Sequence, residues 1–542
     1  MTLTETRPET APAVARTVTP PAMGGLAGWL TTADHKKVGR LYVAWSLLFL
    51  IGAAVLAVLV ALERVDVDGF QIVGEDVADQ LTTMHREGLV FFGVVPLLLG
   101  LGVAVVPLQV GATSIAFPRA AATSFWLWLA GAGLFIGGYA ANGGPGGGDG
   151  EGVELYVLGL GMALLGLLLG AICVATTVIS FRAVGMRLEE VPFFSWAWLA
   201  TAGALLMTVP ALLANLILLG IDHRYGGVLQ PQGISGPFMA QGFAWATHQP
   251  MVFAYALPAL GIVADVVPVF ARARQQLPSV VLGGIGFGAL VGVGSFAQAW
   301  LRDDVLEEPT FVILSFAAVL PVLVVMALGG LTLRSGEPKV GAPLTLALVT
   351  GLALLGGAAA AAVGSIPPLE TAFHDGLGGP TAWLDGQLYL VVAGALLGGL
   401  AGLAYWGPKL WGRLLPAGPA QGLGALVLLG GALWGIPLLV AGVIDQPYGA
   451  ATFAEEDASA ALNGLSAAGA ALTGLAVLGL VLLMLSAFTR GAQAGADPWE
   501  GHTLEWATSS PPPAVNFPEP LGLVSSDRPL LDTREAAMEV AR

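Results

Sequence analysis

The chain has 542 residues, of which 56% are hydrophobic and 11% charged, and its mean hydropathy is +0.78. Soluble domains carry about 25% charged residues, so this composition excludes an ordinary soluble protein and predicts one built into a bilayer. A net charge of −15 at pH 7 also argues against a nucleic-acid partner.

Three regions follow one another along the chain. Residues 1–33 are rich in Thr, Pro and Ala and lack the pattern of a cleavable signal peptide, so we expect a disordered N-terminal segment. Residues 34–490 hold about twelve apolar stretches, such as 41–62 and 157–179, near the roughly 20 residues that a spanning helix needs. They predict an all-α polytopic membrane domain. Residues 491–542 form a polar, proline-rich tail whose prolines exclude a long helix.

Charged residues alternate between successive loops of the predicted membrane domain. One set of loops is basic and the other is acidic, and the positive-inside rule places the basic loops and both termini in the cytoplasm. We therefore expect a multi-pass protein of a bacterial-type inner (plasma) membrane. The basic set comprises Arg119, Arg182, Arg187, Arg272, Arg274, Arg334, Lys339, Lys409 and Arg413.

Specific motifs occur along most of the chain. Residues 31–42 read T-T-A-D-H-K-K-V-G-R-L-Y, residues 245–253 read W-A-T-H-Q-P-M-V-F, and residues 497–506 read D-P-W-E-G-H-T-L-E-W. Residues 107–127 read P-L-Q-V-G-A-T-S-I-A-F-P-R-A-A-A-T-S-F-W-L. These segments resemble haem-copper oxidase subunit I, the catalytic subunit of cytochrome c oxidase in aerobic respiratory chains. The resemblance implies the subunit I fold and, in the family, two haems and one copper.

Most histidine ligands of that family have no counterpart in this chain. Imidazole suits both haem iron and copper, and the family uses six such ligands. This chain also has six histidines, but only His85 matches a ligand position, that of the low-spin haem, and Arg86 follows it where the family usually has glycine. The partner ligand, the high-spin haem ligand and the copper ligands align with Leu388, Gly386, Gln249, Ser295 and Phe296.

The proton-carrying groups of the family are replaced as well. Met251 and Phe253 occupy the places of its membrane glutamate and cross-linked tyrosine, and Val325 that of its lysine. The arginine pair that holds the haem propionates becomes Asp445 and Gln446. One further site resembles the family pattern: His374 and Asp375 match its magnesium ligands at the outer face, where carboxylate oxygen suits that ion.

Three hypotheses follow from this comparison. The first is a catalytically degenerate paralogue with a structural, regulatory or assembly role in an oxidase complex. It would bind no cofactor, or at most a residual haem at His85, and His85→Ala would leave folding unchanged. The alternatives are an active terminal oxidase coupling cytochrome c oxidation and O2 reduction to proton pumping, and a transporter or receptor. The last would reuse the emptied haem cavities, where Gly386 would leave room for a hydrophobic ligand.

The expected partners come from the resemblance and from the charge pattern. The family implies oxidase subunits II and III or another complex that contains a subunit I, in addition to the lipid bilayer. An acidic outer face could also steer a basic electron carrier such as cytochrome c. The simpler reading is that outer loops avoid Lys and Arg for reasons of insertion alone. Bound haem and copper would discriminate between the hypotheses.

Overall fold

The structure, a computed structural model, describes residues 25–65, 72–144, 149–225, 251–301, 308–366, 381–448 and 457–540. Residues Met1–Thr32 and Ala33–Arg542 form two separate units. The described part of the first unit holds the short helix α1 (Ala27–Leu30). Within the described ranges of the second unit, helices are joined by loops and two isolated β-bridges.

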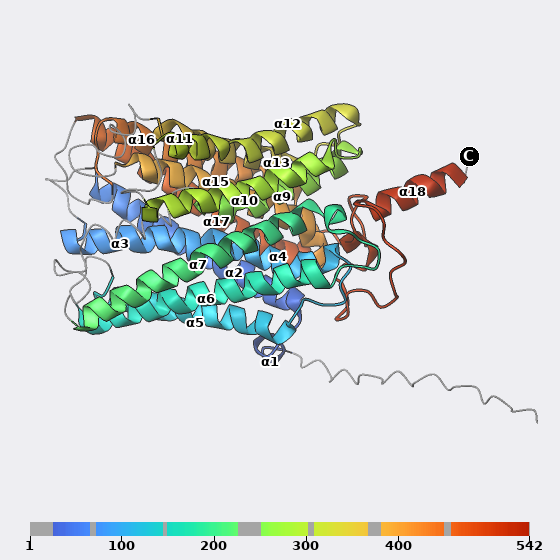
Figure 1. The fold of residues 1–542 in the computed structure, drawn as a ribbon, viewed down its shortest axis with the longest axis horizontal. Helices are drawn as coiled ribbons and strands as arrows, with labels where there is room; N and C mark the ends of the chain where they lie inside the picture. The colour runs from blue at the N-terminus through green and yellow to red at the C-terminus, as the bar shows by residue number, and fades with distance from the viewer. Residues whose placement is uncertain are drawn as a thin grey trace, which may run out of the picture. The chain divides into compact units, whose positions relative to one another are not determined.

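The helices of the second unit run side by side along one axis (Figure 1). In chain order they are α2 (His35–Glu63), α3 (Glu75–Glu87), the π-helix η1 (Gly88–Val94), α4 (Val95–Gln109), α5 (Pro118–Ala140), α6 (Gly150–Ser180), η2 (Leu188–Glu190), α7 (Phe193–Tyr225), α9 (Met251–Ala271), α10 (Pro278–Leu301), α11 (Glu308–Ala317), α12 (Leu320–Ser335), α13 (Ala342–Gly364), α15 (Trp383–Trp411), α16 (Ala417–Val443), α17 (Asp457–Arg490), η3 (Leu504–Ala507) and α18 (Pro529–Val540).

The helix lengths confirm an all-α polytopic membrane fold. In the described ranges, 11 helices are long and apolar enough to cross a bilayer, with α3, η1 and α4 acting as one span from Val77 to Gln109. Helix α10 is not among these 11, because its side chains are described only as far as Val293. Its described part, Pro278–Val293, is a shorter apolar stretch. This set matches the prediction of about twelve spans from apolar stretches.

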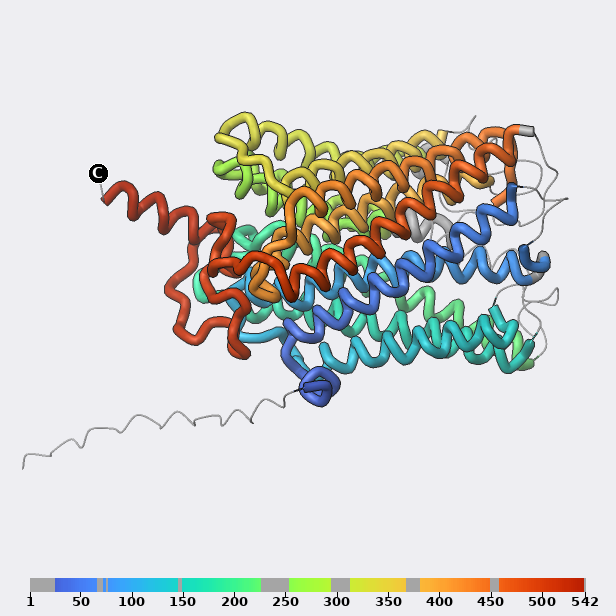
Figure 2. Tube along the Cα trace, turned by 180° about the vertical axis from the view of Figure 1, so that it is seen from behind, coloured from blue at the N-terminus to red at the C-terminus, as the bar shows by residue number. Residues whose placement is uncertain are grey.

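The C-terminal tail lies at one end of the bundle, which we call the tail end (Figure 2). The start of α2 lies there too, since His35 Nε2 and Lys36 Nζ contact Asn516 Oδ1 at 2.9 and 3.1 Å. Successive spans alternate in direction, so the basic residues predicted to share one set of loops lie at or near the tail end, whereas Glu75 and Asp149 lie at the opposite end.

Three central spans form the core: Val77–Gln109, Phe253–Ala271 and Trp383–Trp411 are enclosed by protein throughout their apolar stretches. Glycine lets α15 and α16 touch backbone to backbone. A Cβ built on Gly386 would lie 2.6 Å from the carbonyl oxygen of Gly435, and one on Gly435 would lie 2.7 Å from that of Gly386. Small residues commonly provide such close contacts between membrane helices.

The tail folds back onto the tail end of the bundle. Lys409, near the end of α15, fastens it by donating from Nζ to the carbonyl oxygens of Ala496 and Thr508 at 2.8 and 2.6 Å. The proline-rich stretch is irregular. It ends at Pro529, which stands at the start of the 12-residue helix α18, where the missing N–H of proline costs no hydrogen bond.

Candidate functional site

His85 lies on α3, in the half of the bundle away from the tail, with its side chain buried. Its Nδ1 is 3.0 Å from the carbonyl oxygen of Ala53 on α2, and its Nε2 is 2.9 Å from the hydroxyl of Tyr389 on α15. A carbonyl can only accept, so Nδ1 carries the proton, and in the neutral imidazole Nε2 accepts from Tyr389. The lone pair that a metal would need is therefore already engaged.

Two aromatic rings close the space beside His85. Tyr389 stacks on Trp434 of α16, with centroids 4.3 Å apart and an interplanar angle of 23°. The imidazole lies 5.6 Å from the Trp434 ring and 5.4 Å from the Tyr389 ring. Offset aromatic pairs at such distances stabilise a core beyond the area they bury. His85 thus belongs to a packed cluster contributed by α2, α3, α15 and α16.

The next residue, Arg86, forms a buried bidentate ion pair with Asp385 at the start of α15. Nε and Nη2 donate to Oδ1 and Oδ2 at 2.7 and 2.6 Å, and Asp385 is fully buried. Arg64 Nη1 approaches the same carboxylate at 3.8 Å, and the Arg86 guanidinium lies 4.0 Å from the centre of the Tyr448 ring. We call Arg64, Arg86, Asp385 and Tyr448 the arginine–aspartate cluster.

A second buried carboxylate follows directly. Glu87 accepts hydrogen bonds from the hydroxyls of Tyr156 and Tyr139 at 2.8 and 3.2 Å, which joins α3 to α6 and α5. Glu87 and its tyrosines were not identified as a cluster from the sequence. In a sequence, a carboxylate just before an apolar stretch is usually assigned to the preceding loop.

The two substituted ligand positions on α15 are packing residues. Gly386 meets the backbone of α16, and Leu388 is fully buried in the main apolar core. The expectation that Gly386 leaves room for a ligand is wrong, because α16 fills the space that its missing side chain opens. Phe253 on α9 and Val325 on α12 are buried in the same core.

Asp445 and Gln446, which align with the arginine pair of the family, lie in different environments. Asp445 is exposed in a turn after α16, with φ of 61°, a backbone conformation that Asp tolerates better than most residues. Gln446 is buried and exchanges side-chain hydrogen bonds with Asn463 at 3.1 Å in both directions. The side chains of Met251, Ser295 and Phe296, and the residues Gln249, His374 and Asp375, lie outside the described part of the structure.

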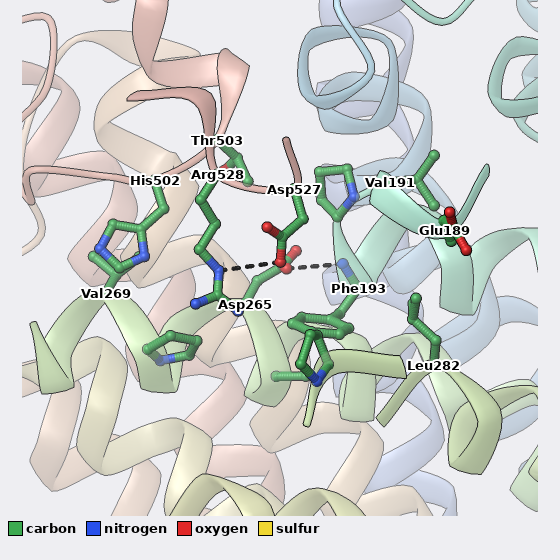
Figure 3. A pocket seen from close by; sticks show the side chains of 14 residues that line it. Glu189, Val191, Phe193, Asp265, Val269, Leu282, His502, Thr503, Asp527 and Arg528 are labelled. Carbon is green, nitrogen blue, oxygen red and sulfur yellow. Dashed lines mark hydrogen bonds and ion pairs between the residues drawn. The ribbon is translucent and has the colours of Figure 1, made fainter. Parts of the chain in front are cut away.

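A second polar group lies at the tail end, where Asp265 caps the start of α7. Its oxygens accept from the backbone N–H groups of Phe193 and Phe194 at 2.9 and 3.1 Å, and Gln109 Nε2 donates to it at 2.9 Å. Three donors thus meet the Asp265 carboxylate at a helix start, where negative charge is favoured. A pocket opens beside this group, and Figure 3 shows Asp265, Asp527 and Arg528 among its lining side chains.

Glu505 of η3 extends this polar group into the tail. Its Oε1 accepts from Trp406 Nε1 at 3.0 Å and from Gln109 Nε2 at 3.4 Å. Burial raises the pKa of the Glu505 carboxyl, and the hydrogen bonds to it offset part of this shift. The tail is therefore joined to α4 and α15 through buried polar contacts.

The comparisons with known proteins agree with this architecture. The family described as cytochrome c and quinol oxidase polypeptide I matches residues 37–472. The chain belongs to this family. The matched range begins at the third residue of α2, includes every helix from α3 to α16, with His85, Arg86 and Asp385 inside it, and ends within α17.

Individual members of the oxidase family align with the chain over nearly its full length. A putative cytochrome c oxidase subunit 1-beta of Streptomyces avermitilis is 29% identical over 98% of this chain and 96% of its own. A probable subunit 1-beta of Nocardia farcinica is 30% identical over 98% and 93%. Cytochrome c oxidase subunit 1 of Bacillus subtilis is 29% identical over 90% and 80%.

The contacts of His85 predict that it supports folding, which does not fit the expectation that His85→Ala leaves folding unchanged. Tyr389→Phe removes the donor to a buried Nε2 and should lower the free energy of unfolding by about 1–3 kcal/mol. His85→Ala should cost at least as much, because it also opens a cavity. Unfolding of the detergent-solubilised protein, followed by intrinsic fluorescence, measures both changes.

His223→Ala provides the matched control. His223 contacts only the carbonyl oxygen of Gly150 among the hydrogen bonds in the described ranges, at 3.2 Å near the end of α7. Its removal should change stability by less than about 0.5 kcal/mol, as is usual for surface positions. Equal losses for the His85 and His223 variants would show that the aromatic cluster does not stabilise the fold.

Proposed function

We propose that this chain is a subunit I homologue that keeps the membrane scaffold of the oxidase family without its oxygen chemistry. It would serve a structural, regulatory or assembly role in an oxidase complex. The observation that carries the proposal is the hydrogen bonding of the His85 side chain. Nε2 of this histidine accepts a hydrogen bond from Tyr389 at 2.9 Å, beside the stacked Tyr389 and Trp434 rings.

A low-spin haem does not fit these residues. In the family such a haem has a histidine on each of its two faces, and each histidine needs a free imidazole nitrogen. On one side Nε2 of His85 is engaged by Tyr389, and on the other the aligned residue is Leu388, whose side chain has no donor atom. The ion-paired Arg86 and Asp385 also occupy the ends of the two helices that would face this haem.

A high-spin haem with copper fits no better. The aligned haem ligand is Gly386, whose Cα faces the backbone of α16 with no space for a side chain. Neither α10 nor α15 contains a histidine in its sequence. The described histidines are His35 and His502 at the tail end, His85, and His223 at the end of α7, so these four do not converge on one centre.

The proposal also includes the orientation of the chain in the membrane and its partner subunits. The basic residues at the tail end favour a cytoplasmic position for that end and for both termini in a bacterial inner membrane. Family membership supports association with oxidase subunits II and III or with another complex containing a subunit I. A magnesium ion at His374 and Asp375 would lie at the outer face.

The proposal predicts that the purified chain carries neither haem nor copper and consumes no oxygen. The test is a pyridine haemochrome spectrum with copper analysis on the full chain, expressed in a host that makes oxidase haems. Cytochrome c oxidase subunit 1 of Bacillus subtilis, produced in the same way, provides the positive control. Both haems and copper in stoichiometric amounts would overturn the proposal and favour an active terminal oxidase.

A further inference from the structure

A pocket at the tail end lies where the segment before α7, the helices α9 and α10, and the tail meet. Its lining includes Pro192, Asp265, Leu282, His502 and Arg528. Figure 3 shows Arg528 between His502 and the two aspartates Asp265 and Asp527. The bundle side supplies apolar side chains with Glu189 and Asp265, and the tail supplies His502, Thr503, Asp527 and Arg528.

Two nitrogen atoms that line this pocket are buried without a hydrogen-bond partner: Nη2 of Arg528 and Nδ1 of His502. The two residues are only 4% and 5% exposed, so bulk water does not replace the missing partners. A buried donor without a partner costs about 1–3 kcal/mol, and more when it is charged. Two such atoms in one pocket point to a bound acceptor.

The nearby carboxylates do not accept hydrogen bonds from these two nitrogen atoms. Asp265 already accepts three hydrogen bonds, from Phe193, Phe194 and Gln109. Asp527 approaches Arg528 only at Nε and at 3.4 Å, which leaves Nη2 free. Burial lowers the pKa of Arg528, and Asp527 offsets only part of that shift.

The surroundings of His502 disfavour its charged form. Its pKa is lowered to about 3, first by burial and then by the guanidinium groups of Arg528, Arg534 and Arg274, with Asp532 opposing them. The imidazole is therefore neutral at pH 7 and keeps one N–H to donate. All three arginines are also paired with carboxylates: Arg274 with Asp532 and Glu535, Arg534 with Asp497, and Arg528 with Asp527 through Nε.

We propose that this pocket binds a phosphate-class oxyanion, which accepts hydrogen bonds from Nη2 of Arg528 and Nδ1 of His502. Guanidinium groups match the geometry of phosphate oxygens and bind them through charge-assisted hydrogen bonds. The oxyanion is either free inorganic phosphate or the headgroup of an anionic lipid at the same membrane surface. The inference does not depend on the proposed function, because His85 and the arginine–aspartate cluster lie in the other half of the bundle.

The test measures binding of inorganic phosphate to the full chain in phosphatidylcholine nanodiscs by isothermal titration calorimetry, in phosphate-free buffer at constant ionic strength. We expect saturable binding that Arg528→Gln weakens by about tenfold or more, as loss of a charge-assisted hydrogen bond does. Arg334→Gln, which removes the same charge from an exposed position at the end of α12, should leave the affinity unchanged.

Nanodiscs that also contain phosphatidylglycerol distinguish the two sources. Phosphate binding that is unaffected by this lipid identifies a site for the free anion, whereas competition by the lipid identifies its headgroup as the ligand. If Arg528→Gln does not fold, Arg528→Lys and His502→Gln replace it, and at least one should weaken binding. Absence of saturable binding to the unmodified chain, or equal binding by all folded variants, would overturn the proposal.

Discussion

Replacing Asp385 with alanine should lower the free energy of unfolding by about 3–5 kcal/mol, which is typical when one partner of a buried ion pair is removed. The carboxylate is fully buried and binds Arg86 through two hydrogen bonds of 2.7 and 2.6 Å. Arg64 adds a second guanidinium at 3.8 Å. Without Asp385, both cations would stay buried beside Tyr448 without their shared counter-charge.

The measurement is the unfolding midpoint of the detergent-solubilised chain, with size-exclusion chromatography to count the folded fraction. Asp445→Ala is the matched control, because Asp445 is an exposed aspartate in the turn after α16. Its loss should change stability by less than about 0.5 kcal/mol. A similarly small effect of Asp385→Ala would mean that water screens the arginine–aspartate cluster.

A double-mutant cycle measures the interaction energy between Arg86 and Asp385 separately from the cost of leaving one buried charge unpaired. Arg86→Leu combined with Asp385→Leu should be more stable than Asp385→Leu alone, because the double variant leaves only Arg64, and not two arginines, buried without the carboxylate. The coupling between the two sites should reach about 0.5–3 kcal/mol, the range for residues in direct contact. Additive effects would show that the pair does not act as a unit.

The fold could be predicted from the sequence because it depends on patterns that are local. Each spanning helix is a run of about 20 apolar residues, and each loop is marked by its charges, so neither needs knowledge of a distant residue. The predicted segments such as 41–62 and 157–179 lie inside α2 and α6. The tail motif D-P-W follows α17, which ends at Arg490.

The contacts of the site could be predicted only in part, because they join residues far apart in the chain. His85 was identified as a matching family position and Leu388 as an altered one, but Asp385 was not identified as the partner of Arg86, although the two form one ion pair across 299 residues. A signal was present: charged residues at membrane depth are usually paired with each other. Choosing the partner required the register of α15 against α3, which a single sequence does not supply.

Glycine was the least predictable residue, because its effect depends on what faces it. Gly386 and Gly356 both lie in apolar helices with small neighbours. A Cβ on Gly386 would meet the α16 backbone at 2.6 Å, whereas one on Gly356 has no atom within 4 Å. The first glycine brings two helices together and the second does not. From sequence alone, both could equally have lined a cavity.

This difference leads to the second prediction with a large effect, on Gly386. Gly386→His would restore the histidine of the oxidase family, but its side chain would enter the backbone of α16 at Gly435 and Leu439. We expect a loss of about 3 kcal/mol or more, at the upper end of the cost of overpacking, and no haem uptake. Adding Leu388→His should not rescue haem binding, because Nε2 of His85 stays engaged by Tyr389.

The matched alanine variants show whether packing causes this loss. Gly386→Ala should cost about 1–3 kcal/mol through backbone displacement, whereas Gly356→Ala, with open space around it, should be close to neutral. Thermal unfolding gives both values, and a pyridine haemochrome spectrum of the histidine variants reports any haem. If Gly386→His is stable and binds haem, α15 and α16 can separate to admit the cofactor. The chain would then be an oxidase subunit that lost its ligands while keeping its haem pocket, and the close contact of Gly386 with Gly435 would be one of two arrangements open to it.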